Sequence, residues 1–329
     1  MTHDTSVHTS FSLVTRNIAA DIAIPLAGII LAVTFPGQQA FLVQIAITAL
    51  LVLSLDLVVG YAGIATLGHV AMYGAGAYAA GLYSIHVWAE PLTGLAVGAV
   101  AGALVALLSG LLLMRTHGLT LLMLTVAVTQ VLYEVASKSR AVTGGDDGLY
   151  GILPDPVLGI FAFDFMGNTA FWYSLVVLAI MFSALRRLMH APFGLVALAV
   201  RDDAGRVTSL GGNVYRHRVA LYVLSGAVAG IAGALTAQTV QVVGLNTLGV
   251  PFSAEILVML ILGGSGRLWG ALLGTLIFMM IHHYAAALDP TSWMLFVGAV
   301  LIAVVVFLPG GALRGLEMMV DAFRREGRA

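Results

Sequence analysis

The sequence predicts an all-α, polytopic transmembrane bundle of about ten spans, and three observations support this fold class. Of the 329 residues, 60% are hydrophobic and only 9% are charged, and the mean hydropathy is +1.00. Uncharged apolar stretches recur along the whole chain, and arginines gather in one interrupting segment and in the C-terminal tail. A soluble domain of this composition would have a mostly apolar surface, whereas a bilayer accepts apolar side chains.

Ten apolar stretches are candidate spans, most of them near the roughly 20 residues that cross a bilayer. In chain order they are Ile18–Phe35, Phe41–Gly60, Leu67–Ile85, Leu92–Met114, Leu119–Ala136, Thr169–Leu188, Val219–Val240, Phe252–Leu262, Leu268–His282 and Ser292–Leu308. A polar tail with Arg16 precedes the first stretch, which lacks a convincing small-residue cleavage site, so we expect a retained span. The short stretch at Phe252–Leu262 is either a span or a re-entrant half-helix.

The arginines set the predicted topology, because positive residues collect on the cytoplasmic side of a membrane. Six arginines lie between Arg186 and Arg218, and four lie between Arg314 and Arg328. Placing both segments inside requires an even number of crossings between them, with the turn around Arg267 reaching the cytoplasm. Both chain ends are then cytoplasmic.

This topology divides the chain into three parts. Residues 1–17 form a cytoplasmic tail, residues 18–309 a transmembrane domain with a cytoplasmic loop at 189–218, and residues 310–329 a second cytoplasmic tail. Lys138 and Arg140 are exceptions, since both fall outside. The acidic residues Asp146 and Asp147 partly balance them.

Composition and motifs exclude several functional classes. The net charge of -1 offers no basic surface for nucleic acid, and the chain has no cysteine for disulfides or thiolate sites. The sequence contains no GxxxxGK[ST] phosphate loop and no arguable nucleophile with a neighbouring base, so we expect neither an ATP site nor a catalytic residue. His69 and the pair His282-His283 lack an acidic or histidine partner at ligand spacing, so we expect no metal site.

Glycines at four-residue spacing predict close helix packing. Lipid gives helices no hydrophobic drive to associate, so small residues that let two backbones approach hold a bundle together. The repeats are Gly94, Gly98 and Gly102, then Gly226 and Gly230, then Gly270 and Gly274.

The loop HAPFGLVALAVRDDAGRVTSLGGNVYRHR predicts a helix that either lies on the membrane or docks on a soluble partner. Pro192 suits a helix start, and Gly211-Gly212 suits its end. One apolar stripe recurs at three- and four-residue spacing: Phe193, Val196, Val200, Ala204, Val207 and Leu210. Four charged residues lie away from it: Arg201, Asp202, Asp203 and Arg206. Gly194 and Gly205 weaken the helix interior, so two short helices are the alternative.

Charged residues inside apolar spans are candidates for a transport pathway, because an unpaired charge in lipid costs on the order of several kcal/mol. They are Asp21, Asp56, Glu134 and Glu255. Asp21 is near a span end and within reach of headgroups, and Glu134 is near the outer end of its span. Asp56 either pairs between helices or lines the pathway. Glu255 either caps the short helix, which Gly263-Gly264 ends, or lines a cavity or gate.

Four segments resemble permease subunits of bacterial ABC importers for branched-chain amino acids. Gly60–Tyr78 is similar to the family's Gly-Tyr-Ala-Gly…Leu-Gly-His…Gly-Ala-Tyr segment, which here contains Gly68 and His69. Thr143–Ile152 resembles a Thr-Gly-Gly…Asp-Gly-Leu…Gly-Ile loop typical of the M-type (LivM-like) subunit. Pro192–Arg216 resembles the family's coupling segment. Ser253–Gly274 resembles its Glu…Leu-Gly-Gly…Gly…Trp-Gly segment.

The chain departs from the family pattern at three places. Ala271 stands where proline is usual, Asp56 stands where an amide is usual, and the usual glutamate beside Asp203 is missing.

The resemblance implies a type II ABC importer bundle, like that of the vitamin-B12 permease, in a bacterial inner membrane. Its partners would be a second homologous permease, two cytosolic ATP-binding subunits that use ATP and Mg²⁺, and a periplasmic solute-binding protein. This chain would bind no cofactor. The expected ATPase-coupling residues are Phe193, Gly194, Arg201, Asp202, Asp203, Arg206, Gly211 and Gly212. The expected pathway or gate residues are Asp56, Gly68, His69, Glu255, Gly263 and Gly264.

Other functions remain open from the residues alone. Urea, short amides and other amino acids are rival substrates to branched-chain amino acids. An ion-driven secondary transporter would carry pathway acids in broken helices, and the stretch near Gly263–Gly266 is compatible with that. The arginine-rich loop argues against it. A membrane-embedded enzyme is a third possibility, but the sequence shows no set of catalytic residues for it.

Overall fold

The computed structural model describes residues 37–164 and 167–288, with eight further positions: Ile24, Pro25, Gly28, Ile29, Thr34, Gly298, Gly311 and Ala312. The spans expected at Ile18–Phe35 and Ser292–Leu308, and both terminal tails, lie outside the described residues apart from these positions. Asp21 also lies outside them.

Eight of the predicted spans fall on helices, as expected for long apolar segments. These are α2 (Gln39–Asp56) with its π-helical continuation η1 (Leu57–Tyr61), α3 (His69–His86), α4 (Pro91–Leu113), α5 (Leu119–Lys138), α7 (Asn168–His190), α10 (Val214–Val240), α11 (Val250–Gly263) and α12 (Leu268–Leu288). Short elements lie between them: α6 (Arg140–Thr143), η2 (Gly145–Asp147), α8 (Pro192–Asp202), α9 (Ala204–Ser209) and η3 (Leu245–Leu248).

Six helices in the described part are long and apolar enough to cross a membrane: α2 with η1, α4, α5, α7, α10 and α12. The chain is therefore a multi-pass membrane protein. At 14 residues, α11 is too short to cross in the usual way.

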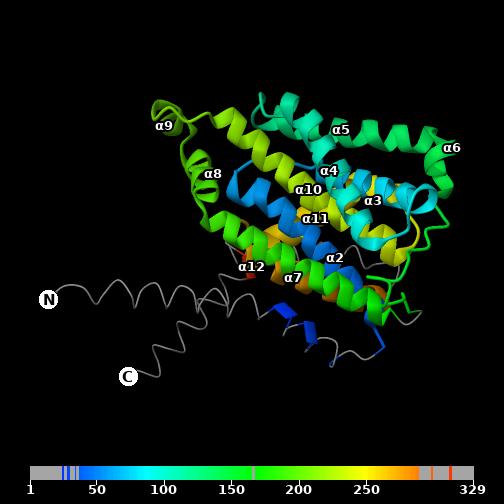
Figure 1. Cartoon of the computed structure of the whole chain (residues 1–329). Coiled ribbons are helices and arrows are strands. Elements are labelled where there is room, and N and C mark those ends of the chain that lie inside the picture. Colours follow the sequence, from blue (N-terminus) through cyan, green and yellow to red (C-terminus); the bar gives the residue numbers. More distant parts are fainter. Residues whose placement is uncertain are drawn as a thin grey trace, which may run out of the picture.

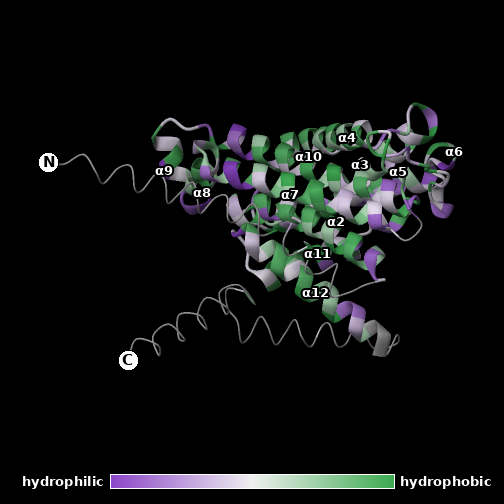
Figure 2. Ribbon diagram, turned by 60° about the horizontal axis from the view of Figure 1, so that its bottom comes forward, coloured by the Kyte–Doolittle hydropathy of each residue, from purple (hydrophilic) through white to green (hydrophobic). Residues whose placement is uncertain are grey.

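The central helix is α2, which packs against α7, α10, α11 and α12 (Figure 1). Of the 18 most apolar consecutive residues of α2 and η1, 89% are buried, against 28% for α4 and 22% for α5. Leu108 and Leu112 of α4 are each 68% exposed, as suits side chains that face acyl tails. Hydrophobic residues cover the long helices, and hydrophilic residues gather near α8–α9 and near α6 (Figure 2).

Glycines hold α4 and α10 in backbone contact. A Cβ atom on Gly102 would lie 2.2 Å from the Gly226 carbonyl oxygen, and one on Gly230 would lie 2.1 Å from the Gly98 carbonyl oxygen. Gly94, one turn before Gly98 in α4, faces the side chain of Gln238. We call this line of contact the glycine seam. Gly270 and Gly274 form a similar contact between α12 and α11.

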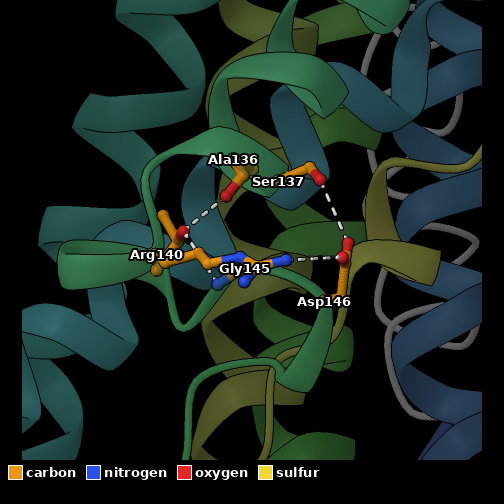
Figure 3. A network of polar contacts seen from close by, with 6 residues as sticks. Ala136, Ser137, Arg140, Gly145 and Asp146 are labelled. Atoms are coloured by element: carbon orange, nitrogen blue, oxygen red, sulfur yellow. Dashed lines mark hydrogen bonds and ion pairs between the residues drawn. The ribbon is translucent and has the colours of Figure 1, made fainter.

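The bundle has two distinct ends, with α8 and α9 at one and α6 at the other (Figure 1). At the α6 end, Ser137 Oγ donates to Asp146 Oδ1 at 3.0 Å, and Arg140 Nη2 lies 3.5 Å from Asp146 Oδ2 (Figure 3). Lys138 Nζ lies 3.4 Å from Glu134 Oε2. Both cations that the predicted topology places outside therefore have acidic neighbours.

Candidate functional site

The predicted docking segment forms two short helices, α8 and α9, rather than one. The break falls at Asp203, whose backbone is extended. Its Oδ1 accepts a hydrogen bond from the Arg206 N–H at 3.0 Å, and Oδ2 lies 2.9 Å from Arg206 Nε. Asp203 thus caps α9 and pairs with its first cation, which explains why the chain turns there and not at Gly205. Gly211, with φ of +84°, ends the segment.

The apolar stripe predicted for this segment is split between two faces. Of its members, Val200 is buried, whereas Val196 is 40% exposed and Leu210 is 88% exposed. The buried face of α8 also contains Gly194 and Ala197, which lie outside the predicted stripe. A Cβ atom on Gly194 would lie 2.2 Å from the Met189 carbonyl oxygen, so α8 turns this glycine face inward against the end of α7.

The remaining charged and aromatic residues of the segment lie around these two faces. Phe193 packs beside His217, with ring centroids 4.6 Å apart. Arg201 and Asp202, at the end of α8, are exposed.

One side chain of this segment reaches the ends of the membrane helices. Arg201 Nη1 donates to the carbonyl oxygen of Gly60 in η1. The last carbonyls of a helix have no donor within that helix, so a guanidinium can satisfy one of them. A π-helical turn also departs from the regular ladder, and such turns are frequent at functional sites.

Asp56 lies next to the Arg201–Gly60 contact, on the inner side of the bundle. Its side chain is fully buried, and Oδ1 accepts a hydrogen bond from the Gly266 N–H at 2.6 Å. A Cβ atom on Gly60 would lie 2.0 Å from that oxygen, so only glycine fits there. Gly266, with φ of +82°, lies in the turn between α11 and α12. We call Asp56, Gly60, Arg201 and Gly266 the junction.

A second polar group lies within the bundle, around His69. Its Nε2 is 2.7 Å from Ser54 Oγ and 3.4 Å from Ser225 Oγ. Both serine hydroxyls donate to backbone carbonyls, of Leu51 at 2.6 Å and of Ser54 at 2.5 Å. His69 is therefore assigned as the Nε2–H tautomer that donates to the serines. Its Nδ1 is buried without a hydrogen-bond partner in the described part of the chain.

The glycines predicted as pathway residues mark close backbone contacts. A Cβ atom on Gly68 would lie 2.6 Å from the Thr125 carbonyl oxygen of α5, and one on Gly263 would lie 1.9 Å from that of Gly270. Gly264, with φ of +101°, ends α11. These positions shape the turns beside α3 and α11.

A cavity of about 890 Å³ occupies the other half of the bundle, and we call it the outer cavity. Its wall includes the starts of α2 and α7 and the ends of α10 and α12, for example at Ala40, Gly167, Gln241 and His283. The segment α8–α9 instead joins the end of α7 to the start of α10. The cavity therefore lies toward the end of the bundle away from α8 and α9.

Glu255 of α11 and His282 of α12 both line the outer cavity and interact electrostatically. Deeper in, the Tyr73 hydroxyl lies 2.6 Å from Thr236 Oγ1. Within the described residues, no three His, Cys, Asp or Glu side chains gather as a metal site would require.

Several of these residues are not apparent from the sequence. Residue type alone marks four of the site residues as candidates: Asp56, Arg201, His69 and Glu255. The structure adds that Asp56 and Arg201 meet at one junction. Ser54 and Ser225 are single serines in apolar helices and give no distinguishing signal. Gly266 takes part through its backbone N–H, which any non-proline residue carries.

An apolar multi-pass bundle with an amphipathic segment tied to its buried helix ends, and a cavity at the opposite end, is typical of a membrane transport permease. The chain matches the family model described as branched-chain amino acid transport system / permease component over residues 39–305, and it belongs to this family.

Three of its relatives carry the name LivM, and a fourth, 26% identical over 245 residues, is the L-arabinose ABC transporter permease protein AraH of Azospirillum brasilense. The chain is 27% identical over 322 residues to the high-affinity branched-chain amino acid transport system permease protein LivM of Salmonella typhimurium, and 25% identical over 319 residues to that of Escherichia coli. Each alignment covers 88% of this chain and 74% of the relative. A probable LivM permease of Methanocaldococcus jannaschii is 25% identical over 232 residues, which cover 66% of this chain and 65% of the relative. No solved structure matches the chain.

Proposed function

We propose that this chain is the membrane-spanning permease subunit of an ABC importer that carries branched-chain amino acids across a bacterial inner membrane by alternating access. The names of the three LivM relatives and of the matching family support this substrate class. It pairs with a second homologous permease. Two cytosolic subunits hydrolyse ATP with Mg²⁺, and a periplasmic binding protein delivers the solute. The chain itself binds no cofactor.

The proposed topology has about ten spans in a type II arrangement, with residues 1–17, 189–218 and 310–329 in the cytoplasm. Six apolar helices, the shorter α3 and α11, and the two stretches outside the described residues make up this number. The separate ends of the bundle support the orientation, because α8–α9 carry the arginine-rich loop.

The junction is the observation that carries the proposal. On one side, α8 and α9 expose Leu195, Leu210 and Asp202, a mixed surface that suits a groove on a soluble partner. On the other side, Arg201 contacts η1, and through Asp56 the same place contacts the α11–α12 turn. A displacement of α8 by an ATPase therefore acts on two membrane elements at once.

Reconstitution of the full importer in liposomes tests this proposal. We expect Arg201→Ala to assemble with the ATPases but to lose coupling, so that solute uptake per ATP hydrolysed falls about tenfold or more. This follows from losing a charged hydrogen bond worth roughly 1.5–3 kcal/mol. Arg216→Ala is the matched control, since Arg216 is an exposed arginine of the same loop outside the junction. Wild-type coupling in Arg201→Ala, or failure of the wild-type chain to assemble with ATPases, would overturn the proposal.

A further inference from the structure

The outer cavity has a chemical character that the coupling argument does not use. We propose that it is a binding site for one α-amino acid with an apolar side chain, in which Glu255 holds the ammonium group. This inference rests on the proposed function, and it places a solute site inside a single permease subunit.

The size and position of the cavity suit a transported solute. Its volume of about 890 Å³ falls within the range of small-molecule pockets, roughly 300–1,000 Å³. It lies at the end of the bundle away from α8–α9, where the proposed topology places the outside. Further toward α8–α9, His69 with its two serines and then the junction fill the bundle with packed side chains. A solute that enters from outside therefore stops in the cavity until the bundle rearranges.

The charges in the wall match a zwitterion. Glu255 is only partly exposed in a mostly apolar wall, where a carboxylate is costly unless positive charge lies near it. His282 already acts on this carboxylate, and the ammonium of a bound solute would add a second positive charge. His282 on the neighbouring helix supplies an imidazole for the α-carboxylate. Gln44 and Thr48 add neutral polar groups to the same wall. One acid and one imidazole on adjacent helices fit an ammonium and a carboxylate that share one carbon atom.

The rest of the wall suits an apolar side chain. Aromatic rings and a thioether face the cavity from three helices: Phe41 from α2, Phe252 and Met259 from α11, and Phe278 from α12. Such side chains bury aliphatic groups without specific hydrogen bonds, and Met adapts to several shapes. Urea or a short amide can donate hydrogen bonds to the carboxylate of Glu255, but it brings no positive charge and no aliphatic group for this wall. The cavity therefore favours an amino acid over those rivals.

Equilibrium binding of radiolabelled L-leucine to the purified importer, with the binding protein omitted, tests the site. Two analogues separate the charged groups: 4-methylvalerate lacks the ammonium and isoamylamine lacks the carboxylate. We expect the wild-type complex to bind leucine and 4-methylvalerate to compete at least about tenfold more weakly, as loss of a charged hydrogen bond implies. Isoamylamine should compete better than 4-methylvalerate. This comparison needs no variant, so it stands even if a substitution impairs assembly.

Glu255→Gln adds the residue-level test. We expect it to weaken leucine binding about tenfold or more and to remove the difference between leucine and 4-methylvalerate. Glu134→Gln is the control, because Glu134 is an exposed acid on α5 outside the cavity. Undetectable leucine binding by the wild type, equal competition by 4-methylvalerate, or wild-type binding in Glu255→Gln would overturn the inference. Stimulation of ATP hydrolysis by the loaded binding protein is recorded in parallel. If that stimulation persists, the proposed function stands even though the cavity site falls.

Discussion

The carboxylate of Asp56 and the backbone N–H of Gly266 meet at 2.6 Å although 210 positions separate them in the sequence. The contact fixes the end of α2 to the turn between α11 and α12. Asp56 Oδ2 is buried without a hydrogen-bond partner in the described part of the chain, and Arg201 is the cation that acts on this carboxylate. The junction therefore combines a hydrogen bond that an amide could also make with a charge that an amide lacks.

Asp56 variants separate these two contributions. Asp56→Asn keeps a carbonyl oxygen for Gly266, so we expect a small change in stability together with weaker coupling to Arg201. Asp56→Ala leaves the half-buried Gly266 N–H without its acceptor and should lower stability by about 1–3 kcal/mol. Thermal unfolding of each purified variant in detergent measures its stability. Equal unfolding temperatures for the two variants would contradict the assigned hydrogen bond.

Gly230→Ala tests the glycine seam. The new Cβ atom would lie 2.1 Å from the Gly98 carbonyl oxygen, and a backbone atom cannot swing aside as a side chain does. We expect a loss of stability of about 1–3 kcal/mol or a failure of α4 to dock on α10. Gly205→Ala in the exposed α9 is the control, because its Cβ atom would meet only the Asp203 side chain at 3.2 Å. Limited proteolysis of membranes that contain each variant reports whether α4 has docked on α10. Indistinguishable digestion of both variants would count against the seam.

His69 variants test the assigned tautomer. Gln at position 69 places an N–H donor near the position of Nε2, so His69→Gln should remain close to the wild type in stability. His69→Leu removes the donor while both serine hydroxyls keep their carbonyl acceptors. We therefore expect a loss of only about 1 kcal/mol from hydrogen bonding, beyond any change in packing. Denaturant titration in mixed micelles compares the two variants. Greater stability of the leucine variant than of the glutamine variant would refute the donor role.

The two ends of the bundle provide a test of topology. The native chain has no cysteine, so single cysteines can be introduced at Ser209 in α9 and at Tyr150 near α6. Both positions are exposed. An impermeant thiol reagent applied from the periplasm should label Tyr150→Cys and spare Ser209→Cys until the membrane is opened. Labelling of both from the periplasm would contradict the proposal that the two ends face opposite sides, and labelling of Ser209→Cys alone would reverse the orientation.

The helices were predictable because each apolar segment specifies its own backbone hydrogen bonds. Thus α5 begins at the predicted Leu119, and α10 ends at the predicted Val240. The break between α8 and α9 was harder to place. Two glycines suggested an interruption, yet the capping carboxylate of Asp203 determines its position.

The junction and the outer cavity depend on tertiary packing. Asp56 and Arg201 are noticeable in sequence, but the partner that joins the first to the α11–α12 turn is a peptide N–H, which carries no sequence signal. Glu255 stands out as an acid in an apolar stretch. Its proximity to His282 exists only once α11 has folded back on α12.

The glycine seam also limits how the molecule can change shape. Because α4 and α10 meet through main-chain atoms at Gly98, Gly102, Gly226 and Gly230, no rotamer is available to absorb sliding between them. We expect α4 and α10 to move together as one rigid unit, and relative movement to occur between helices that pack through side chains, such as α2 and α7. The distance between spin labels on α4 and α10 should then stay constant throughout the transport cycle. The pair α4 and α10 would then be a fixed reference frame in which the displacement of the other helices can be measured.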